Sequence, residues 1–459
     1  MKELISIHDR YRFEIKLNLD ESSSYKFEYY FFLPSSLNIS CYTYDKFKFY
    51  SSLQRYIRYQ TPEMDLYTVI DLKNSLSPLS RIIDGLNELK RSSSIFVEER
   101  VIDEMKLLGA IIRDKIRDAK ADELLSILKL ADESFQKIDQ IINSYKYSQR
   151  IVDTFKYVDE YLNIIKIEKL SDVLEQVDIN EELKKDLLSY NDKCFSYIDF
   201  NGYKKISPDN IDSFLYYRGL LKKFVSSCLF LKVQPSFDLY SHIISSIASA
   251  IAMLFAILVT IYIQKRYPFE SVIFIVLVII SYVFKDRIKE FSKIFFSKIA
   301  IDYIYDRKLK IYEPVHNIKI GYIKESFSLL SKESIADDVL KIRNINNFDI
   351  IDEDAKFEVV LKYKKIIFLK RHIINIYHTR RKNLVSILRF SIEDFLKHTD
   401  DAITNYSFYH NSIKYSFNAK RNYHLNLIIK SFKIDKKIDY KRYRIIFNRN
   451  GILKVENII

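Results

Sequence analysis

The residues best suited to bind another molecule are basic side chains near the end of the chain. Tyrosines lie among them, at 363 and 377 in the first group and at 440 and 443 in the second. Basic side chains neutralise phosphate groups, and aromatic rings stack on exposed bases. The candidate anion-binding residues are Lys362, Lys364, Lys365, Lys370, Arg371, Arg380, Arg381, Lys382, Lys441, Arg442 and Arg444.

Two acidic partners fit these basic residues. The chain contains 35 tyrosines and 32 phenylalanines, so aromatic residues between the lysines are expected from composition alone. Nucleic acid therefore stays the weaker alternative. Anionic lipids of the inner leaflet are the simpler partner for a basic region close to a membrane.

A search for catalytic motifs finds none that is recognisable. The six glycines do not form a nucleotide-binding or nucleophile-elbow pattern, and the eight histidines include no HExxH. The three cysteines, Cys41, Cys194 and Cys228, lack CxxC spacing. The acidic clusters at 337–338, 352–354 and 400–401 are typical of turns or helix caps. We therefore expect no cofactor and no metal, and we identify no catalytic residue.

The strongest structural signal is an apolar segment in the middle of the chain. Residues 239–264 are 26 residues without a charge, which predicts a transmembrane helix. A second uncharged run at 271–284 has 14 residues, so a re-entrant or interfacial segment is its alternative. The connection at 265–270 is too short for a domain. The sequence thus predicts a two-helix transmembrane hairpin over 239–284.

Basic residues near the hairpin predict its orientation. Three lysines precede it and five basic residues follow it, whereas the loop carries only Lys265 and Arg266. Basic residues favour the cytoplasmic side, so we expect both termini in the cytoplasm of a protein of the bacterial inner membrane. Small residues recur four apart on the first helix, in the rows Ser245 and Ser249 and Ala248, Ala252 and Ala256. They predict close helix packing, either within the hairpin or in a homo-oligomer.

Net charge is unevenly distributed along the chain. Residues 285–459 contain 36 basic and 21 acidic residues, and residues 1–284 contain 37 and 39. A basic C-terminal domain next to a membrane would face the anionic lipid surface.

The part of the chain before the hairpin is predicted to form two regions. Apolar residues alternate with polar ones from Tyr11 to Leu19, and 26–33 and 44–53 are further strand candidates, so we expect a β-rich domain at 1–90. No glycine or proline interrupts the chain between Gly109 and Gly202, which predicts a helical region at 91–235. Its heptad-like seam predicts an intramolecular bundle or, alternatively, a coiled coil that binds a partner. The seam is Leu124, Leu128, Ala131, Phe135, Ile138, Ile142 and Tyr145.

The part after the hairpin, 285–459, is expected to be a basic cytoplasmic α+β domain with an antiparallel sheet. Strand candidates are 309–315, 318–323, 357–370, 412–417 and 423–429, and a helix is expected near 382–399. Asn450 and Gly451 predict a tight hairpin turn in which both residues take positive φ.

The predicted fold class is therefore an α+β membrane protein with a β-rich N-terminal region, a helical bundle or coiled coil, a transmembrane hairpin and a C-terminal α+β domain. The first functional hypothesis is a membrane-anchored, non-enzymatic sensor, scaffold or interaction protein. The alternatives are an oligomeric membrane effector that forms a leak or pore, and an enzyme with an unrecognised site in the C-terminal domain.

Overall fold

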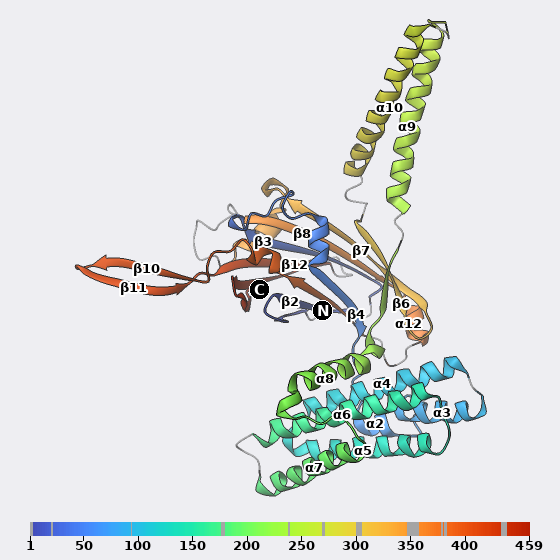
Figure 1. The fold of residues 1–459 in the computed structure, drawn as a ribbon, viewed down its shortest axis with the longest axis vertical. Coiled ribbons are helices and arrows are strands. Elements are labelled where there is room, and N and C mark those ends of the chain that lie inside the picture. The colour runs from blue at the N-terminus through green and yellow to red at the C-terminus, as the bar shows by residue number, and fades with distance from the viewer. Residues whose placement is uncertain are drawn as a thin grey trace.

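The structure is a computed structural model with three visible parts. A β unit lies in the centre, a helical bundle packs at one end, and two long helices project from the other side (Figure 1). The chain is an α+β protein with an N-terminal β sheet, a central helical region and a C-terminal antiparallel sheet. The described residues are 3–19, 22–92, 94–175, 180–236, 239–268, 271–299, 305–346, 358–377, 380, 383–432 and 438–459.

The larger sheet of the β unit combines strands from both ends of the chain. All of its neighbouring strands are antiparallel, and β3 from the N-terminal region lies between β12 and β8. Within the described ranges its order is β14 (Gly451–Asn457), β13 (Ile438–Asn448), β12 (Tyr423–Phe432), β3 (Ser24–Pro34), β8 (Glu358–Leu369), β7 (Ile318–Leu330), β6 (Arg307–Glu313) and β5 (Lys232–Pro235).

The smaller sheet mixes the two ends in the same way. Its order is β1 (Glu3–Ile7), β2 (Arg12–Leu19), β9 (Leu384–Ser391) and β4 (Leu53–Tyr59). The two sheets face each other across an apolar core, where Phe31 of β3 stacks on Phe390 of β9 with ring centroids 4.9 Å apart. The β regions expected separately at 1–90 and 285–459 therefore form one unit. Each region supplies strands whose ladder hydrogen bonds are completed by the other.

Two local predictions in the β regions are wrong. The strand expected at 44–53 is mostly helix α1 (Lys46–Ser51). The side chain of Asp45 accepts a hydrogen bond from the Lys48 N–H and caps the start of this helix. The helix expected near 382–399 is mostly strand β9, followed by the short α13 (Glu393–Leu396). Strand β9 is buried on both faces, which hides the period of two.

The neighbouring strand candidates 412–417 and 423–429 do not pair with each other. Strand β11 (Ile413–Lys420) pairs with β10 (Ile403–His410), not with β12, and this two-stranded arm is exposed along its whole length (Figure 1). The hairpin between β13 and β14 is present, but of Asn450 and Gly451 only the glycine has positive φ. Helices α11 (Asp337–Asn344) and α12 (Arg371–Tyr377) lie beside the larger sheet.

The central region is an intramolecular helical bundle. The seam from Leu124 to Ile142 is buried inside it, whereas Tyr145 is exposed. The seam is thus used within the molecule because α6 runs through the middle of the bundle and contacts α4, α5, α7 and α8. The helices are α2 (Leu66–Ile70), α3 (Pro78–Arg91), α4 (Ile95–Asp118), α5 (Ala121–Asn143), α6 (Gln149–Leu174), α7 (Glu181–Phe200) and α8 (Ile211–Ser226).

The two projecting helices, α9 (Leu239–Gln264) and α10 (Val272–Ile299), pack along each other and are called the stalk below. Among the described residues, α9 over Ser245–Gln264 is the one helix long and apolar enough to cross a membrane. The prediction of two spans is therefore not supported for α10, because charged residues begin at Lys285 after a short apolar segment. Helix α9 qualifies as a candidate span by its length and composition.

Candidate functional site

A cavity of about 450 Å³ lies between the edges of the two sheets. Strand β4 at the edge of the smaller sheet forms one wall, and β5, β6, β7 and β8 of the larger sheet contribute the others. Its described lining contains four basic residues and one acidic residue, namely Arg55, Arg307, Lys308, Lys365 and Asp306. This concentration of charge next to an apolar core makes the cavity the best candidate for a functional site.

The charged residues reach the cavity because they occupy apolar positions of their strands. Lys365 is in phase with Tyr363 and Ile367, which are buried on the inner face of β8. Glu325 in β7 and Arg55 in β4 hold the equivalent inward positions. Successive side chains of a strand point to opposite faces, so all three extend into the space between the sheets.

Inside this space Arg55, Glu325 and Tyr363 form a hydrogen-bonded cluster, and Lys365 lies beside it with a separate hydrogen bond. Arg55 forms an ion pair with one carboxylate oxygen of Glu325, and the Tyr363 hydroxyl donates to the other at 2.7 Å. The Lys365 ammonium donates to the Ser386 hydroxyl of the facing sheet at 2.9 Å. Glu325 and Lys365 are completely buried, which makes their hydrogen bonds strong and their charges costly to leave unpaired.

Burial changes the protonation behaviour of this cluster. Burial lowers the pKa of Lys365 to about 8, the nearby Arg55 adds to the decrease, and Glu325 opposes it. Burial and the Glu325 carboxylate raise the pKa of Tyr363. The surroundings of Lys365 therefore disfavour its positive charge despite the carboxylate beside it.

The rim of the cavity is built around Asp306. Its carboxylate pairs with Lys46 and accepts hydrogen bonds from the Tyr50 hydroxyl at 3.1 Å and the Phe327 N–H at 2.7 Å. The Arg307 guanidinium lies 4.1 Å from the centre of the Tyr50 ring. Asp306 is thus engaged by its own neighbours, and Arg307 is positioned by an aromatic face.

The basic residues predicted from the sequence are dispersed over the β unit. On the outer face of β8, Lys362 pairs with Glu28 at 3.7 Å, and Lys364 lies 5.7 Å from the Tyr305 ring. Lys370 is exposed at the end of that strand. Lys365 alone among the described candidates turns inward to the cavity, because it follows Lys364 directly and strand side chains alternate.

The remaining candidates of the first group connect different parts of the fold. The Arg371 guanidinium donates to the carbonyl oxygens of Leu19 at 3.1 Å and Ser22 at 3.0 Å. Arg380 forms an ion pair with the buried Glu104 of the bundle. Arg381 and Lys382 lie outside the described residues.

The second group lies on β13 and is mostly engaged within the protein. Arg442 is completely buried and donates to the carbonyl oxygens of Ile342 and Ile345 at the end of α11. Arg444 is buried and lies 3.9 Å from the Glu456 carboxylate, and Lys441 is partly exposed. The structure therefore does not bring the two groups together into one basic surface, and anion binding by their exposed members stays a prediction.

Of the charged cavity residues, Lys365 alone is among the candidates predicted from the sequence, although a sequence signal marks others. A charged residue at an apolar position of an alternating strand marks Lys365, Glu325 and Arg55 alike. Ser386 could not be recognised in this way, because both faces of β9 are buried and the strand shows no alternation. Arg307 precedes the apolar positions of β6 and shares their phase.

A second polar cluster lies in the helical bundle around a smaller cavity of about 140 Å³. Lys166 donates to Asp132 at 2.6 Å, and the buried Asp159 accepts from the hydroxyls of Tyr197 at 3.0 Å and Tyr203 at 2.8 Å. Burial raises the pKa of Asp159, although Lys166 and the two tyrosines oppose the increase. This cluster ties α5, α6 and α7 together.

In the parts of the chain that the structure describes, His, Cys, Asp and Glu form no group of three or more that could hold a metal ion. Comparison with family models, with curated proteins and with solved structures finds no match for this chain. The geometry of the cavities and of the stalk is therefore the basis for a functional proposal.

Proposed function

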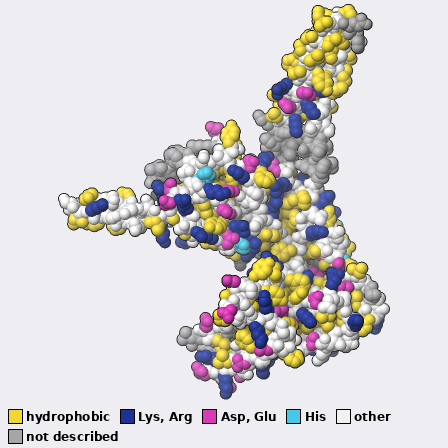
Figure 2. Space-filling model, viewed as in Figure 1, with side chains coloured by type: hydrophobic (Ala, Val, Ile, Leu, Met, Phe, Trp, Pro, Cys, Tyr) yellow, Lys and Arg dark blue, Asp and Glu magenta, His cyan; other side chains and the backbone are white. Residues whose placement is uncertain are grey.

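We propose that the protein is a membrane-anchored, non-enzymatic sensor or interaction protein that the stalk attaches to the bilayer. The observation that carries this proposal is helix α9, whose apolar side chains are exposed along most of its length. Figure 2 shows apolar side chains over the outer part of the stalk and a band of charged side chains below them. Exposed apolar surface on this scale is unfavourable in water, and lipid would cover it.

The connection of the stalk to the β unit supports attachment from one side. Strand β5 precedes α9, strand β6 follows α10, and the two strands pair with each other, with Lys232 opposite Tyr312. The regions before and after the stalk therefore have to lie on the same side of a membrane. A chain that enters the bilayer through α9 would return through α10, with both termini cytoplasmic in our proposal.

Aromatic and basic residues bracket the apolar part of the stalk. Arg266 lies 5.4 Å from the ring of Tyr262 at the far end, and Lys285 lies 3.7 Å from the ring of Tyr282 nearer the β unit. Such pairs are typical of the two membrane interfaces. The apolar segment of α10, from Val272, is about 20 Å long at 1.5 Å per residue, so a return through this helix would need local thinning of the bilayer.

The cavity adds the sensor element of this proposal. Its walls include Val233 and Pro235 of β5 and Leu309 of β6, which are the strands that carry the stalk. An occupant would thus contact both connections to the membrane helices. We do not propose a pore, because the seam of the bundle and the small residues Ala248 and Ala252 are buried within the monomer.

The test compares two double substitutions in the full-length protein. Leu254→Asp with Leu258→Asp places two charges on exposed positions of α9, with exposed fractions of 59% and 58%. Each charge costs about 3 kcal/mol near the bilayer centre, so this variant should be extracted from membranes by alkaline carbonate. The matched control, Leu188→Asp with Leu215→Asp, changes exposed leucines of the bundle and should stay with the membrane fraction, as should the unchanged protein. Release of the unchanged protein would contradict the proposal.

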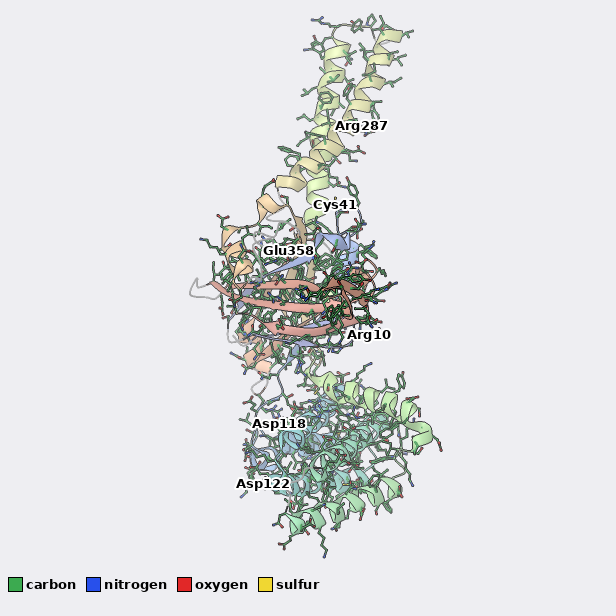
Figure 3. The ribbon with its side chains drawn as sticks, turned by 90° about the vertical axis from the view of Figure 1, so that its left-hand side faces the viewer. Arg10, Cys41, Asp118, Asp122, Arg287 and Glu358 are labelled. Atoms are coloured by element: carbon green, nitrogen blue, oxygen red, sulfur yellow. The ribbon has the colours of Figure 1, made fainter. Side chains whose placement is uncertain are left out.

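The side of attachment can be read from a native cysteine. Cys41 is exposed at the end of the β unit nearest the stalk, whereas Cys194 and Cys228 are buried (Figure 3). A membrane-impermeant maleimide should label Cys41 only after the inner membrane is permeabilised. Labelling in intact spheroplasts would place the β unit on the opposite side.

A further inference from the structure

We propose that the cavity between the two sheets is a binding site for a small amphipathic anion. The acid group of the ligand meets the basic wall formed by Arg55, Arg307 and Lys365. Its apolar body lies against Ile57 and Leu309. This inference rests on the sensor role proposed for the cavity and names the chemical class of its ligand.

The charge balance of the cavity favours an anion. Four basic residues and one carboxylate, Asp306, are found among the described lining residues. Asp306 already pairs with Lys46, and the neighbouring Glu325 bonds to both Arg55 and Tyr363. A surplus of positive charge remains in a region of low dielectric, where a charge-assisted hydrogen bond is strong.

Lys365 is the second reason to expect an anion. It is completely buried, and its hydrogen bond goes to the Ser386 hydroxyl instead of a carboxylate. An ammonium has three donors, so this bond leaves capacity for a further acceptor. Burial lowers its pKa to about 8, and a bound anion would restore the charged form.

The size and walls of the cavity restrict the ligand further. A volume of about 450 Å³ lies within the range of small-molecule sites, which is roughly 300 to 1,000 Å³. Apolar walls next to the basic groups favour an acid group on an apolar body over a bare inorganic ion. Such a ligand has two possible sources, a fatty acid from the bilayer beside the stalk or a soluble aromatic acid.

The experiment measures binding to the full-length protein in lipid nanodiscs by calorimetry, with empty nanodiscs subtracted. Decanoate represents the lipid source and phenyl phosphate the soluble source, and decanol and phenol are their neutral analogues. We expect at least one anion to bind once per chain and at least tenfold more tightly than its neutral analogue. Tighter binding of decanoate supports the lipid source, and tighter binding of phenyl phosphate supports the soluble source.

Variants locate the binding in this cavity. Arg307→Gln removes a basic wall residue and should weaken binding at least tenfold, whereas the control Lys310→Gln removes the same charge from the opposite face of β6 and should not. Lys365→Met is an independent second variant with the same expected loss. Equal affinity for anions and neutral analogues, or equal affinity of Arg307→Gln and Lys310→Gln, would overturn the proposal.

Discussion

The β unit and the helical bundle each bury a lysine, and they satisfy its charge differently. In the bundle, Lys166 donates to the Asp132 carboxylate at 2.6 Å and to the Asn163 side chain at 3.3 Å. In the β unit, Lys365 donates to a serine hydroxyl, and the nearest carboxylate, Glu325, has both oxygens engaged by other side chains. The bundle therefore completes its polar cluster with its own residues, and the β unit does not.

The cavities beside the two lysines also differ in how far the protein's own residues satisfy their charged groups. The bundle cavity has about 140 Å³, and tyrosine hydroxyls already bond its buried carboxylate, Asp159. The cavity of the β unit has about 450 Å³ and a surplus of basic residues. A buried charge can thus stabilise the fold in one region and be available to bind a ligand in another. The difference depends on whether the protein itself supplies the counter-charge.

The largest effect is expected from removing the cation that Glu325 depends on. Arg55→Met leaves a completely buried carboxylate without its ion pair and should lower the free energy of unfolding by about 3 kcal/mol. Urea unfolding of the full-length protein in detergent, followed by tyrosine fluorescence, measures this change.

An exposed pair is the control for that substitution. Arg12 and Asp9 lie 3.6 Å apart with about two fifths of each side chain exposed. Arg12→Met should change the free energy of unfolding by about 0.5 kcal/mol or less. Equal effects at both arginines would show that the Glu325 cluster does not stabilise the β unit.

The next effect comes from making the same substitution at the two buried lysines. Lys166→Met breaks an ion pair with the partly exposed Asp132 and should cost about 2 kcal/mol. Lys365 forms a hydrogen bond to Ser386 and no ion pair. Because Lys365→Met removes a buried charge without breaking an ion pair, it should lower the free energy of unfolding by less than about 1 kcal/mol or raise it. Urea unfolding again measures both.

Cys194 gives a local readout of the bundle in the same comparison. This buried thiol lines the bundle cavity beside Lys166, and burial raises its pKa to about 11. Because a buried thiol reacts when the bundle opens locally, Lys166→Met should speed the reaction of Cys194 with a thiol reagent, even though Lys166 lowers the pKa of this thiol in the closed bundle. Lys365→Met and the control Lys169→Met, at a half-buried lysine of the same helix, should not speed it. Similar losses of stability at Lys166 and Lys365 would remove the contrast between the two regions.

The smallest expected effect is a difference in pH dependence. Folding lowers the pKa of Lys365 to about 8, against about 10.4 in the unfolded chain, so the unfolded state binds more protons in this window. The free energy of unfolding should therefore rise with pH, by about 1 kcal/mol between pH 8 and 9. The free energy of unfolding should keep rising until the pH reaches the pKa of the unfolded chain. Below pH 8 this contribution of Lys365 is absent.

Subtracting the curve of Lys365→Met isolates this contribution. The charges that act on Lys365 are those of Glu325 and Arg55, and the Tyr363 hydroxyl bonds to Glu325. These groups, and the charged residues Asp306, Arg307 and Lys308 that line the same cavity, are shared by both proteins. The difference between the curves should vanish if Lys365 has the ordinary pKa of a lysine. Lys166→Met should leave the rise intact, because Lys166 belongs to the other cluster.

Several elements could be predicted from local pattern, and their errors have physical causes. Strand β2 shows the alternation that predicts it, β3 and β8 coincide with the strand candidates 26–33 and 357–370, and the seam of α5 is buried as its spacing indicates. The sequence pattern wrongly predicts a helix at β9, because both faces of this strand are buried and no alternation remains. The basic residues near 362–382 could be identified from the sequence, but the residues that they contact in the fold could not be predicted.

The apolar helix α9, the helical bundle and the inward phase of Lys365 follow from local sequence, since they depend on neighbours within a few residues. The pairing of β3 with β8 and β12, and the position of β9 between β2 and β4, become visible only in the folded chain. Strand partners hundreds of residues apart are selected by shared burial and ladder hydrogen bonds, which leave no local pattern. The same long-range pairing places Arg55 and Lys365 at one cavity and brings Glu325 to Arg55.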